Sequence, residues 1–240
     1  MSAQPRNPVF CAIDTADIGH AEALVRAVGP VVGGIKLGKE FFAAFGPEGV
    51  RRIDAIAGLP LFLDVKYHDI PNTVGGAIAA LCRLDPFMVN VHVTGGPAMM
   101  RAAADAAASA TAGAARPLVI GVTVLTSLDD DDLAAVGLRG PVTERVVAMA
   151  RLARDCGLDG VVCSPAEIAP IRAACGPGFR LVVPGIRPAG SARGDQKRVL
   201  TPAEALALGA DDLVVGRPIT AADDPAAAAA RAVLGELDAG

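Results

Sequence analysis

Short apolar runs alternate with amphipathic, alanine-rich stretches along the whole chain. Eight runs rich in Val, Ile and Leu have the length and composition of buried strands: Pro8–Asp14, Val31–Leu37, Leu61–Val65, Phe87–His92, Pro117–Val124, Gly160–Cys163, Arg180–Val183 and Asp212–Val215. Helical stretches lie between them, several opening with proline, a favoured first helical residue: Asp17–Val28, Thr73–Leu84, Pro97–Ala110, Pro141–Cys156, Pro165–Ala174, Pro202–Leu208 and Pro225–Leu237. This alternation predicts successive strand–helix units around a parallel sheet.

The number of units favours one closed architecture. Eight strand–helix units in 240 residues match the α/β fold known as the (β/α)8 TIM barrel. No linker-like change of composition divides the chain, so we expect a single domain over residues 1–240. A doubly wound open sheet is the alternative.

The stretch from Leu61 to Val74 carries the most suggestive polar residues. Its apolar run ends in Asp64, Lys66 and Asp69, where a parallel sheet opens to solvent. Residues two apart on a strand point to the same face, so Asp64 and Lys66 are predicted to share one pocket. A solvated loop is the simpler alternative for three charges in six residues.

Other strands of such a barrel deliver polar residues to the same end, where barrel active sites lie. The residues at or just after the predicted strand ends are Asp14, Lys36, Asn90, His92, Thr126, Ser127, Arg187, Gly216 and Arg217. Each unpaired buried ion is unfavourable by several kcal/mol, so a chain that needed only a fold would rarely assemble such a ring. The pattern therefore predicts an active site.

A long connection follows the seventh predicted strand. Pro184–Thr201 contains four basic residues and three glycines. Connections of this length inside a domain are usually lids or disordered segments. We interpret residues 185–201 as a lid that closes on an anion. Gly216 and Arg217 would meet that anion at the start of a short helix, a favourable phosphate site.

Composition narrows the function classes. Hydrophobic residues make up 52% of the chain and charged residues 20%, which is typical of a compact protein. A net charge of −4, no Trp and one Tyr argue against a nucleic-acid-binding surface. No apolar run approaches the ~18 residues of a membrane span, and the N-terminus has no signal-peptide pattern. We therefore expect a cytoplasmic protein without nucleic-acid or membrane partners.

The potential metal ligands are dispersed along the sequence. The histidines, His20, His68 and His92, lack metal-ligand spacing, and no Cys-x-x-Cys pair occurs. We expect all five cysteines to be structural thiols: Cys11, Cys82, Cys156, Cys163 and Cys175. The sequence therefore predicts no metal site.

A set of motifs in fixed order resembles one enzyme family. FLDVKYHDIPNT, VNVHVTGG, GVTVLTS, GLDGVVCS, VVPGIRPAG, GDQKR and LVVGRPIT together resemble orotidine 5'-phosphate decarboxylases over roughly Pro8 to Pro225. The Asp-x-Lys-x-x-Asp core alone is shared by a wider group of barrels. The resemblance implies a homodimeric (β/α)8 enzyme of pyrimidine biosynthesis. It also implies conversion of orotidine 5'-phosphate to uridine 5'-phosphate and CO2, with no metal or organic cofactor.

The resemblance also implies roles for individual residues. Lys66 would donate a proton to C6 of the pyrimidine, and Asp64 would lie beside the substrate carboxylate. Asp14 and Lys36 would meet the ribose hydroxyls, with Lys36 also contacting Asp64. Asp69, with Ile70 and Thr73, would reach into the site of the second subunit. The remaining substrate-binding positions are Val65, Tyr67, His68, Pro71, Asn72, Thr126, Ser127, Arg187, Gln196, Gly216 and Arg217.

Two other functions remain open at this point. A magnesium-dependent sugar-phosphate decarboxylase or aldolase of the wider group would have an acidic residue in place of Lys36, because an ammonium repels the metal. A non-catalytic phosphate-binding barrel would bind uridine phosphate without turning over orotidine phosphate.

Overall fold

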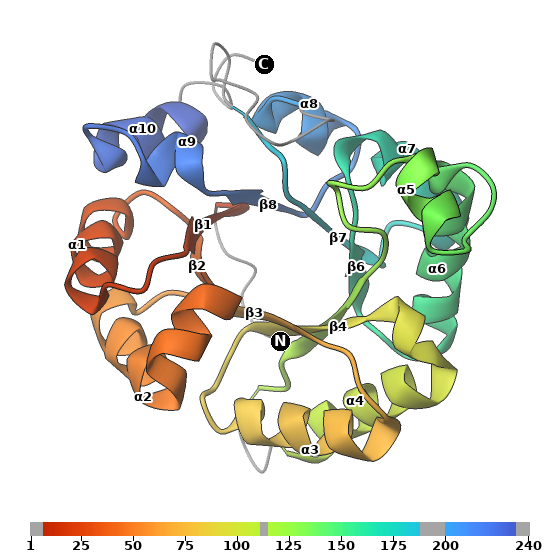
Figure 1. Cartoon of the computed structure of the whole chain (residues 1–240). Coiled ribbons are helices and arrows are strands. Elements are labelled where there is room, and N and C mark those ends of the chain that lie inside the picture. The colour runs from red at the N-terminus through yellow and green to blue at the C-terminus, as the bar shows by residue number, and fades with distance from the viewer. Residues whose placement is uncertain (1–6, 111–114, 188–199, 234–240) are drawn as a thin grey trace.

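Eight parallel strands close into a barrel in the computed structural model, which describes residues 7–110, 115–187 and 200–233. The strands follow one another around the barrel in sequence order, and the last pairs with the first (Figure 1). Their bounds are β1 (Val9–Ile13), β2 (Gly34–Gly38), β3 (Leu61–Tyr67), β4 (Met88–His92), β5 (Leu118–Val122), β6 (Gly160–Val162), β7 (Arg180–Val183) and β8 (Asp212–Val215). The predicted (β/α)8 barrel is therefore confirmed, and the open sheet is excluded.

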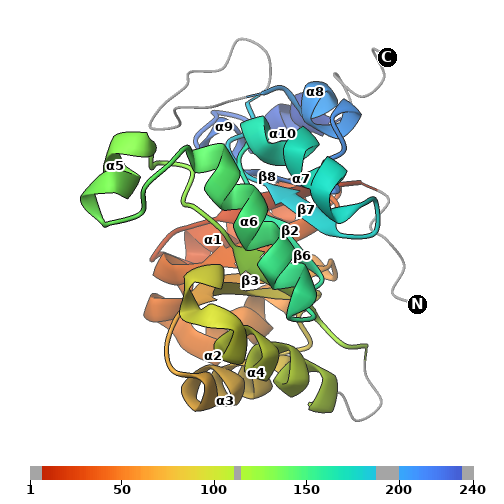
Figure 2. The same cartoon turned by 90° about the vertical axis from the view of Figure 1, so that its right-hand side faces the viewer.

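Helices form the outer layer of the barrel (Figures 1 and 2). The α-helices are α1 (Ile18–Val28), α2 (Lys39–Ala57), α3 (Pro71–Cys82), α4 (Gly96–Ser109), α5 (Asp130–Ala135), α6 (Val142–Asp155), α7 (Ile168–Cys175), α8 (Pro202–Ala207), α9 (Arg217–Thr220) and α10 (Pro225–Val233). Two single 3₁₀ turns, η1 (Val93–Gly95) and η2 (Pro165–Glu167), precede α4 and α7. None of the helices in the described ranges is both long and apolar enough to cross a membrane.

The start of β2 and the whole of α2 differ from the prediction for local reasons. Strand β2 begins at Gly34 and not at Val31, because the amide of Val32 still donates to the carbonyl of Val28 at the end of α1. Helix α2 was not delimited from the apolar pattern. It is kinked at Gly46, where φ is 55°, and Pro47 follows, so its two halves do not share one helical period.

Apolar side chains fill the molecule in two layers. One lies between the strands and the helices, and the other fills the barrel axis. The axial layer includes Phe10, Phe62, Met88, Ile120 and Val182, all at most 1% exposed. Successive strand residues alternate between these layers, so Asp64 and Asn90, two positions after Phe62 and Met88, also point inward.

An ion pair lies at the start of β7 and β8, below the axial layer. Arg180 Nη2 donates to Asp212 Oδ1 at 2.8 Å, and the guanidinium lies 5.4 Å from the ring centre of Phe87. Asp212 is fully buried, so removing either charge would leave the other unpaired in the protein interior. The pair closes the floor of the barrel.

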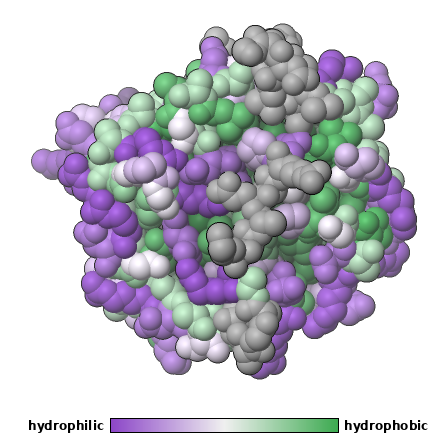
Figure 3. All heavy atoms as spheres, turned by 180° about the vertical axis from the view of Figure 1, so that it is seen from behind, coloured by the Kyte–Doolittle hydropathy of each residue, from purple (hydrophilic) through white to green (hydrophobic). Residues whose placement is uncertain are grey.

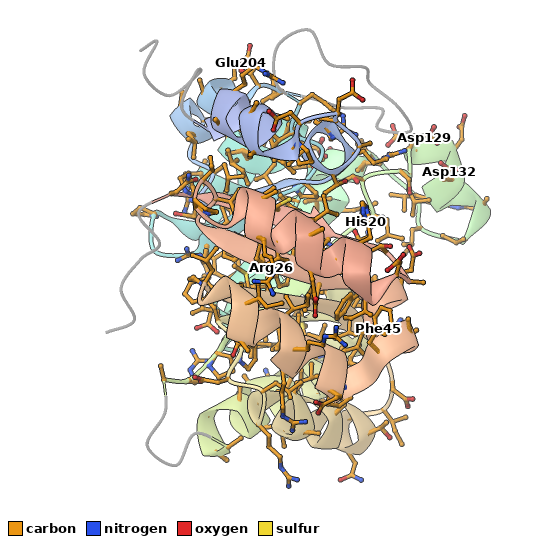
Figure 4. The ribbon with its side chains drawn as sticks, turned by 90° about the vertical axis from the view of Figure 1, so that its left-hand side faces the viewer. His20, Arg26, Phe45, Asp129, Asp132 and Glu204 are labelled. Carbon is orange, nitrogen blue, oxygen red and sulfur yellow. The ribbon has the colours of Figure 1, made fainter. Side chains whose placement is uncertain are left out.

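The two ends of the barrel differ in shape. Figure 1 looks into the end at which the strands finish, and Figure 3 shows the opposite end, whose outer rim is mostly hydrophilic. At the first end α5 projects from the body, as Figure 4 shows at Asp129 and Asp132. These two residues form the capping box of α5, each side chain accepting a hydrogen bond from the backbone amide of the other.

Candidate active site

Four charged side chains of alternating sign form a continuous chain at the strand ends. Lys36 Nζ lies 3.2 Å from Asp14 Oδ2 and 3.1 Å from Asp64 Oδ2. Lys66 Nζ lies 2.5 Å from Asp64 Oδ1. Lys36 and Asp64 are buried, whereas the side chain of Asp14 is 44% exposed. The side chains predicted to share one pocket therefore do so.

Neighbouring strands hold the first three of these groups together. Lys36 lies at the centre of β2, and the register pairs Gly38 with Asp64 on β3. A Cβ atom at Gly38 would lie 2.1 Å from Asp14 Oδ1. Glycine at this position therefore allows the Asp14 carboxylate to approach Lys36.

Electrostatics keep the two buried groups of the chain ionised. Burial alone would lower the pKa of Lys36, but the charges of Asp64 and Asp14 outweigh burial and raise it above its ordinary value. Burial alone would raise the pKa of Asp64, but Lys36 and Lys66, with hydrogen bonds from Lys66 and Asn90, lower it below its ordinary value. A buried carboxylate therefore persists at neutral pH, held by two ammonium groups.

The backbone of Lys66 departs from regular strand geometry. Its φ is 53°, in the left-handed region that non-glycine residues rarely adopt. The pairing of β3 with β4 shifts register between Leu63 and Tyr67, so a bulge interrupts the strand at this point. The prediction that Asp64 and Lys66 meet is confirmed, but the bulge and not the plain alternation directs Lys66. Strained backbone of this kind is concentrated at functional sites.

Two adjoining cavities open beside the charge chain. One has a volume of about 170 Å³, with Asp64 and Lys66 on one side and an apolar wall on the other: Phe62, Val122, Val124, Leu125, Val162, Val182 and Val214. The second has a volume of about 220 Å³ and is lined by Asp14, Gly185, Arg187, Gly216 and Arg217 among others. Lys36, Pro184 and Val214 line both. A ligand with an apolar ring at one end and an anionic group at the other fits this pair.

The cationic end of the second cavity is built by the segments after β7 and β8. The amide of Arg187 donates to the carbonyl of Leu200 at 3.0 Å, and Ile186 and Leu200 form an isolated parallel bridge. Helix α9 begins at Arg217, with Gly216 as its N-cap, as the sequence predicts. Both arginines therefore reach one cavity from different strands.

Comparison with known proteins identifies the family. The sequence model of the family described as "Orotidine 5'-phosphate decarboxylase / HUMPS family" matches residues 7–232. The chain belongs to this family. Among curated members, the protein named orotidine 5'-phosphate decarboxylase of Rhodospirillum rubrum is 54% identical over 239 residues, covering 99% of this chain and 96% of its own. The protein of the same name from Moorella thermoacetica is 53% identical over 236 residues, covering 97% of this chain and 93% of its own.

A solved structure of the decarboxylase family has the same fold. The crystal structure of the Lactobacillus acidophilus protein named orotidine 5'-phosphate decarboxylase superimposes with a TM-score of 0.83 at 36% identity. It covers 94% of this chain and 97% of that protein. The predicted family membership is confirmed.

The residues of the decarboxylase motif that follow Lys66 lie at the rim of the barrel. Asp69 is exposed, and its Oδ1 accepts a hydrogen bond from the amide of Ile70 at 2.6 Å. Ile70 is 66% exposed, and Pro71, Asn72 and Thr73 form the first turn of α3. Helix α3 thus begins two residues before the predicted Thr73. In the described part of a single chain, the ion pairs of Asp64 are with Lys36 and Lys66, and Asp69 is not among them.

Other predicted positions of the decarboxylase family lie at different depths. Thr126 and Ser127 form a turn after β5, and Thr126 lines the first cavity whereas Ser127 is exposed. Val65 and Tyr67 are half-buried and pack against the core between barrel and helices, which leaves their backbone nearer the site. Gln196, with most of the predicted lid, lies outside the described residues.

A histidine pair adjoins the charge chain. The rings of His68 and His92 lie 5.4 Å apart between centroids, whereas His20 lies on α1 at the outside of the barrel (Figure 4). Burial, with the nearby charges of His68, Lys39 and Lys66, lowers the pKa of His92 to about 4. His92 is therefore a neutral imidazole at pH 7, which makes it a poor proton donor at that pH.

Proposed function

We propose that this protein removes CO2 from orotidine 5'-phosphate to give uridine 5'-phosphate, without metal or organic cofactor, as the last step of pyrimidine nucleotide synthesis. The observation that carries the proposal is the chain from Asp14 through Lys36 and Asp64 to Lys66, at the junction of an apolar and a cationic cavity. The relatives' printed names support the same activity.

The proposed substrate orientation follows from the two cavities. The pyrimidine lies against the apolar wall of the first, with its carboxylate beside Asp64 and C6 facing Lys66. The phosphate lies in the second cavity, at Arg187, Gly216 and Arg217. Asp14 and Lys36 meet the ribose hydroxyls between them. Thr126 and Ser127 cover the pyrimidine from the rim.

The charge chain supplies the chemistry. When the C6–carboxylate bond breaks, its electron pair stays on C6, and CO2 leaves. Lys66 Nζ stabilises that developing negative charge and then transfers a proton to C6, after which solvent reprotonates the amine. Asp64 beside the substrate carboxylate raises the ground state by ~4 kcal/mol for two charges about 4 Å apart at an effective dielectric near 20.

Binding of the remote phosphate offsets this repulsion. The barrier to be removed is on the order of 20 kcal/mol, which is more than a single proton donor supplies. Contacts that do not change during reaction hold the substrate carboxylate against Asp64 and exclude water from the ring. The arginines of the second cavity therefore contribute to turnover as well as affinity.

One assay tests the activity and separates it from its alternatives. Incubation with orotidine 5'-phosphate should remove the orotate absorbance at a rate that a chelator does not change. Chelator-sensitive activity on a keto-sugar phosphate would support the magnesium-dependent alternative instead. That alternative places a cation where Lys36 already lies 3.1 Å from Asp64 and 3.2 Å from Asp14. Uridine phosphate binding without turnover would indicate a non-catalytic barrel.

A homodimer belongs to the same proposal. Ile70 is a large apolar side chain that is 66% exposed beside the exposed Asp69, at the rim where α3 begins. Burying Ile70 against a second copy would bring Asp69 and Thr73 to the partner's site. Sedimentation velocity should give twice the 24.2 kDa of one chain, and Ile70→Asp should lower that mass. Full activity of a protein that sediments with the mass of a single chain would contradict the proposed homodimer.

The five cysteines support a cytoplasmic location. All five lie among the described residues, and none of them is joined in a disulfide, as a reducing compartment favours. Fractionation of cells that express the chain would test the location.

A further inference from the structure

Asn90 is a fully buried polar residue with no role in the mechanism above. It lies at the centre of β4, two residues after the axial Met88, and points into the barrel beside the charge chain. Both ends of its carboxamide have partners on β3. Nδ2 donates to Asp64 Oδ1 at 2.6 Å, and Oδ1 accepts from the amide of Lys66 at 2.7 Å.

The first contact fixes the orientation of the Asp64 carboxylate. Asp64 Oδ1 accepts from Asn90 Nδ2 and from Lys66 Nζ, while Oδ2 faces Lys36. A carboxamide supplies a donor without adding charge, so the alternating signs of the chain are preserved. The opposite orientation of the amide would point an oxygen at the carboxylate, so the hydrogen-bond pattern also fixes the Asn90 rotamer.

The second contact holds the bulge in β3. Backbone pairing joins Leu63 to Val89 and resumes only at Tyr67 with Val91, so one residue of β4 spans three of β3. Within that gap the Lys66 amide bonds to the Asn90 side chain instead of a backbone carbonyl. This bond secures Lys66 in its left-handed conformation, from which its ammonium reaches Asp64.

We propose that Asn90 is a positioning residue, whose single carboxamide sets both the Asp64 carboxylate and the backbone of Lys66 for the proton transfer. The inference rests on the proposed decarboxylation. It adds a group that touches neither substrate nor reacting carbon but determines where the two groups that do so are held.

Two variants at Asn90 separate its two contacts. Asn90→Ala removes both, so kcat should fall about 100-fold, as expected for a misplacement of roughly 1 Å, while affinity for uridine 5'-phosphate changes less than about threefold. Loss of a donor to Asp64 raises that carboxyl's pKa, so the acidic limb of the kcat profile should move to higher pH. Asn90→Asp keeps the acceptor for the Lys66 amide but turns a second carboxylate toward Asp64.

The aspartate variant has a distinct signature. A protonated Asp at this position can donate to Asp64 as the carboxamide does, and the neighbouring carboxylate raises its pKa. Activity of Asn90→Asp should therefore increase as pH falls from 8 toward 6, whereas that of Asn90→Ala should decrease. If Asn90 acted only through packing, neither variant would show its expected change of activity between pH 8 and pH 6.

Thr123→Val is the matched control. Thr123 is 3% exposed, and its Oγ1 donates to the carbonyl of Val162 at 2.8 Å, so the variant also loses a buried hydrogen bond but none to the charge chain. It should lower Tm and leave the acidic limb in place. The inference is overturned if both Asn90 variants keep the wild-type kcat and pH profile, or if their kcat only follows Tm as in the control. Absence of turnover in the unmodified protein would instead refute the proposed function.

Discussion

Lys66→Ala is expected to lower kcat by at least about 10⁴-fold and to leave binding of uridine 5'-phosphate measurable. The ammonium lies 2.5 Å from Asp64 and is the proposed proton donor. A positioned acid contributes about 10² to 10⁴-fold, and stabilisation of developing charge about 10² to 10³-fold more. Stopped-flow or steady-state loss of orotate absorbance measures kcat, and calorimetry measures product binding.

Lys39→Ala is the control for this experiment. Lys39 is exposed at the start of α2, at the same end of the barrel, and is the one lysine among the described residues that lies outside the charge chain. Lys39→Ala changes the net charge by the same amount as Lys66→Ala and should lower kcat less than about tenfold. Near-normal turnover in Lys66→Ala would eliminate Lys66 as the acid.

Arg217→Ala is expected to weaken the binding of uridine 5'-phosphate about 10- to 100-fold and the binding of uridine less than about threefold. Arg217 begins α9 and lines the cavity proposed to hold the phosphate. A charge-assisted hydrogen bond contributes about 1.5–3 kcal/mol, and the nucleoside lacks the group that would accept it. Competitive inhibition by the two ligands measures the difference.

Arg26→Ala provides the comparison for Arg217. Arg26 is exposed on α1, on the outer surface of the barrel (Figure 4). If loss of a positive charge acted only through the electrostatic field of the whole protein, Arg26→Ala and Arg217→Ala would weaken nucleotide binding to the same extent. Equal losses for nucleotide and nucleoside in Arg217→Ala would place the phosphate elsewhere.

Much of the fold could be predicted because strands of a barrel are apolar on both faces. Continuous Val, Ile and Leu runs therefore marked every strand, and β-strand order followed from the strand–helix alternation. Helix α2 was not predicted because the Gly46–Pro47 kink interrupts the helical periodicity of its apolar residues. The start of β2 was misplaced because Val31 and Val32 are as apolar as a strand but complete the turn after α1.

The charged members of the candidate site could also be predicted, because polar residues at the ends of apolar runs are conspicuous. The left-handed conformation of Lys66 could not, since the bulge depends on how β3 pairs with β4. Asn90 was noted at a strand end, but its two partners lie 24 and 26 residues away in sequence. The apolar wall of the first cavity is likewise invisible in sequence, where Val162 and Val182 resemble any core residue.

The buried ion pair of Arg180 and Asp212 has a consequence for molecular traffic. Phe10, Phe62 and Met88 fill the barrel axis between this pair and the candidate active site. We therefore expect substrate entry and the departure of both products to take place at the end of the barrel where the two cavities open.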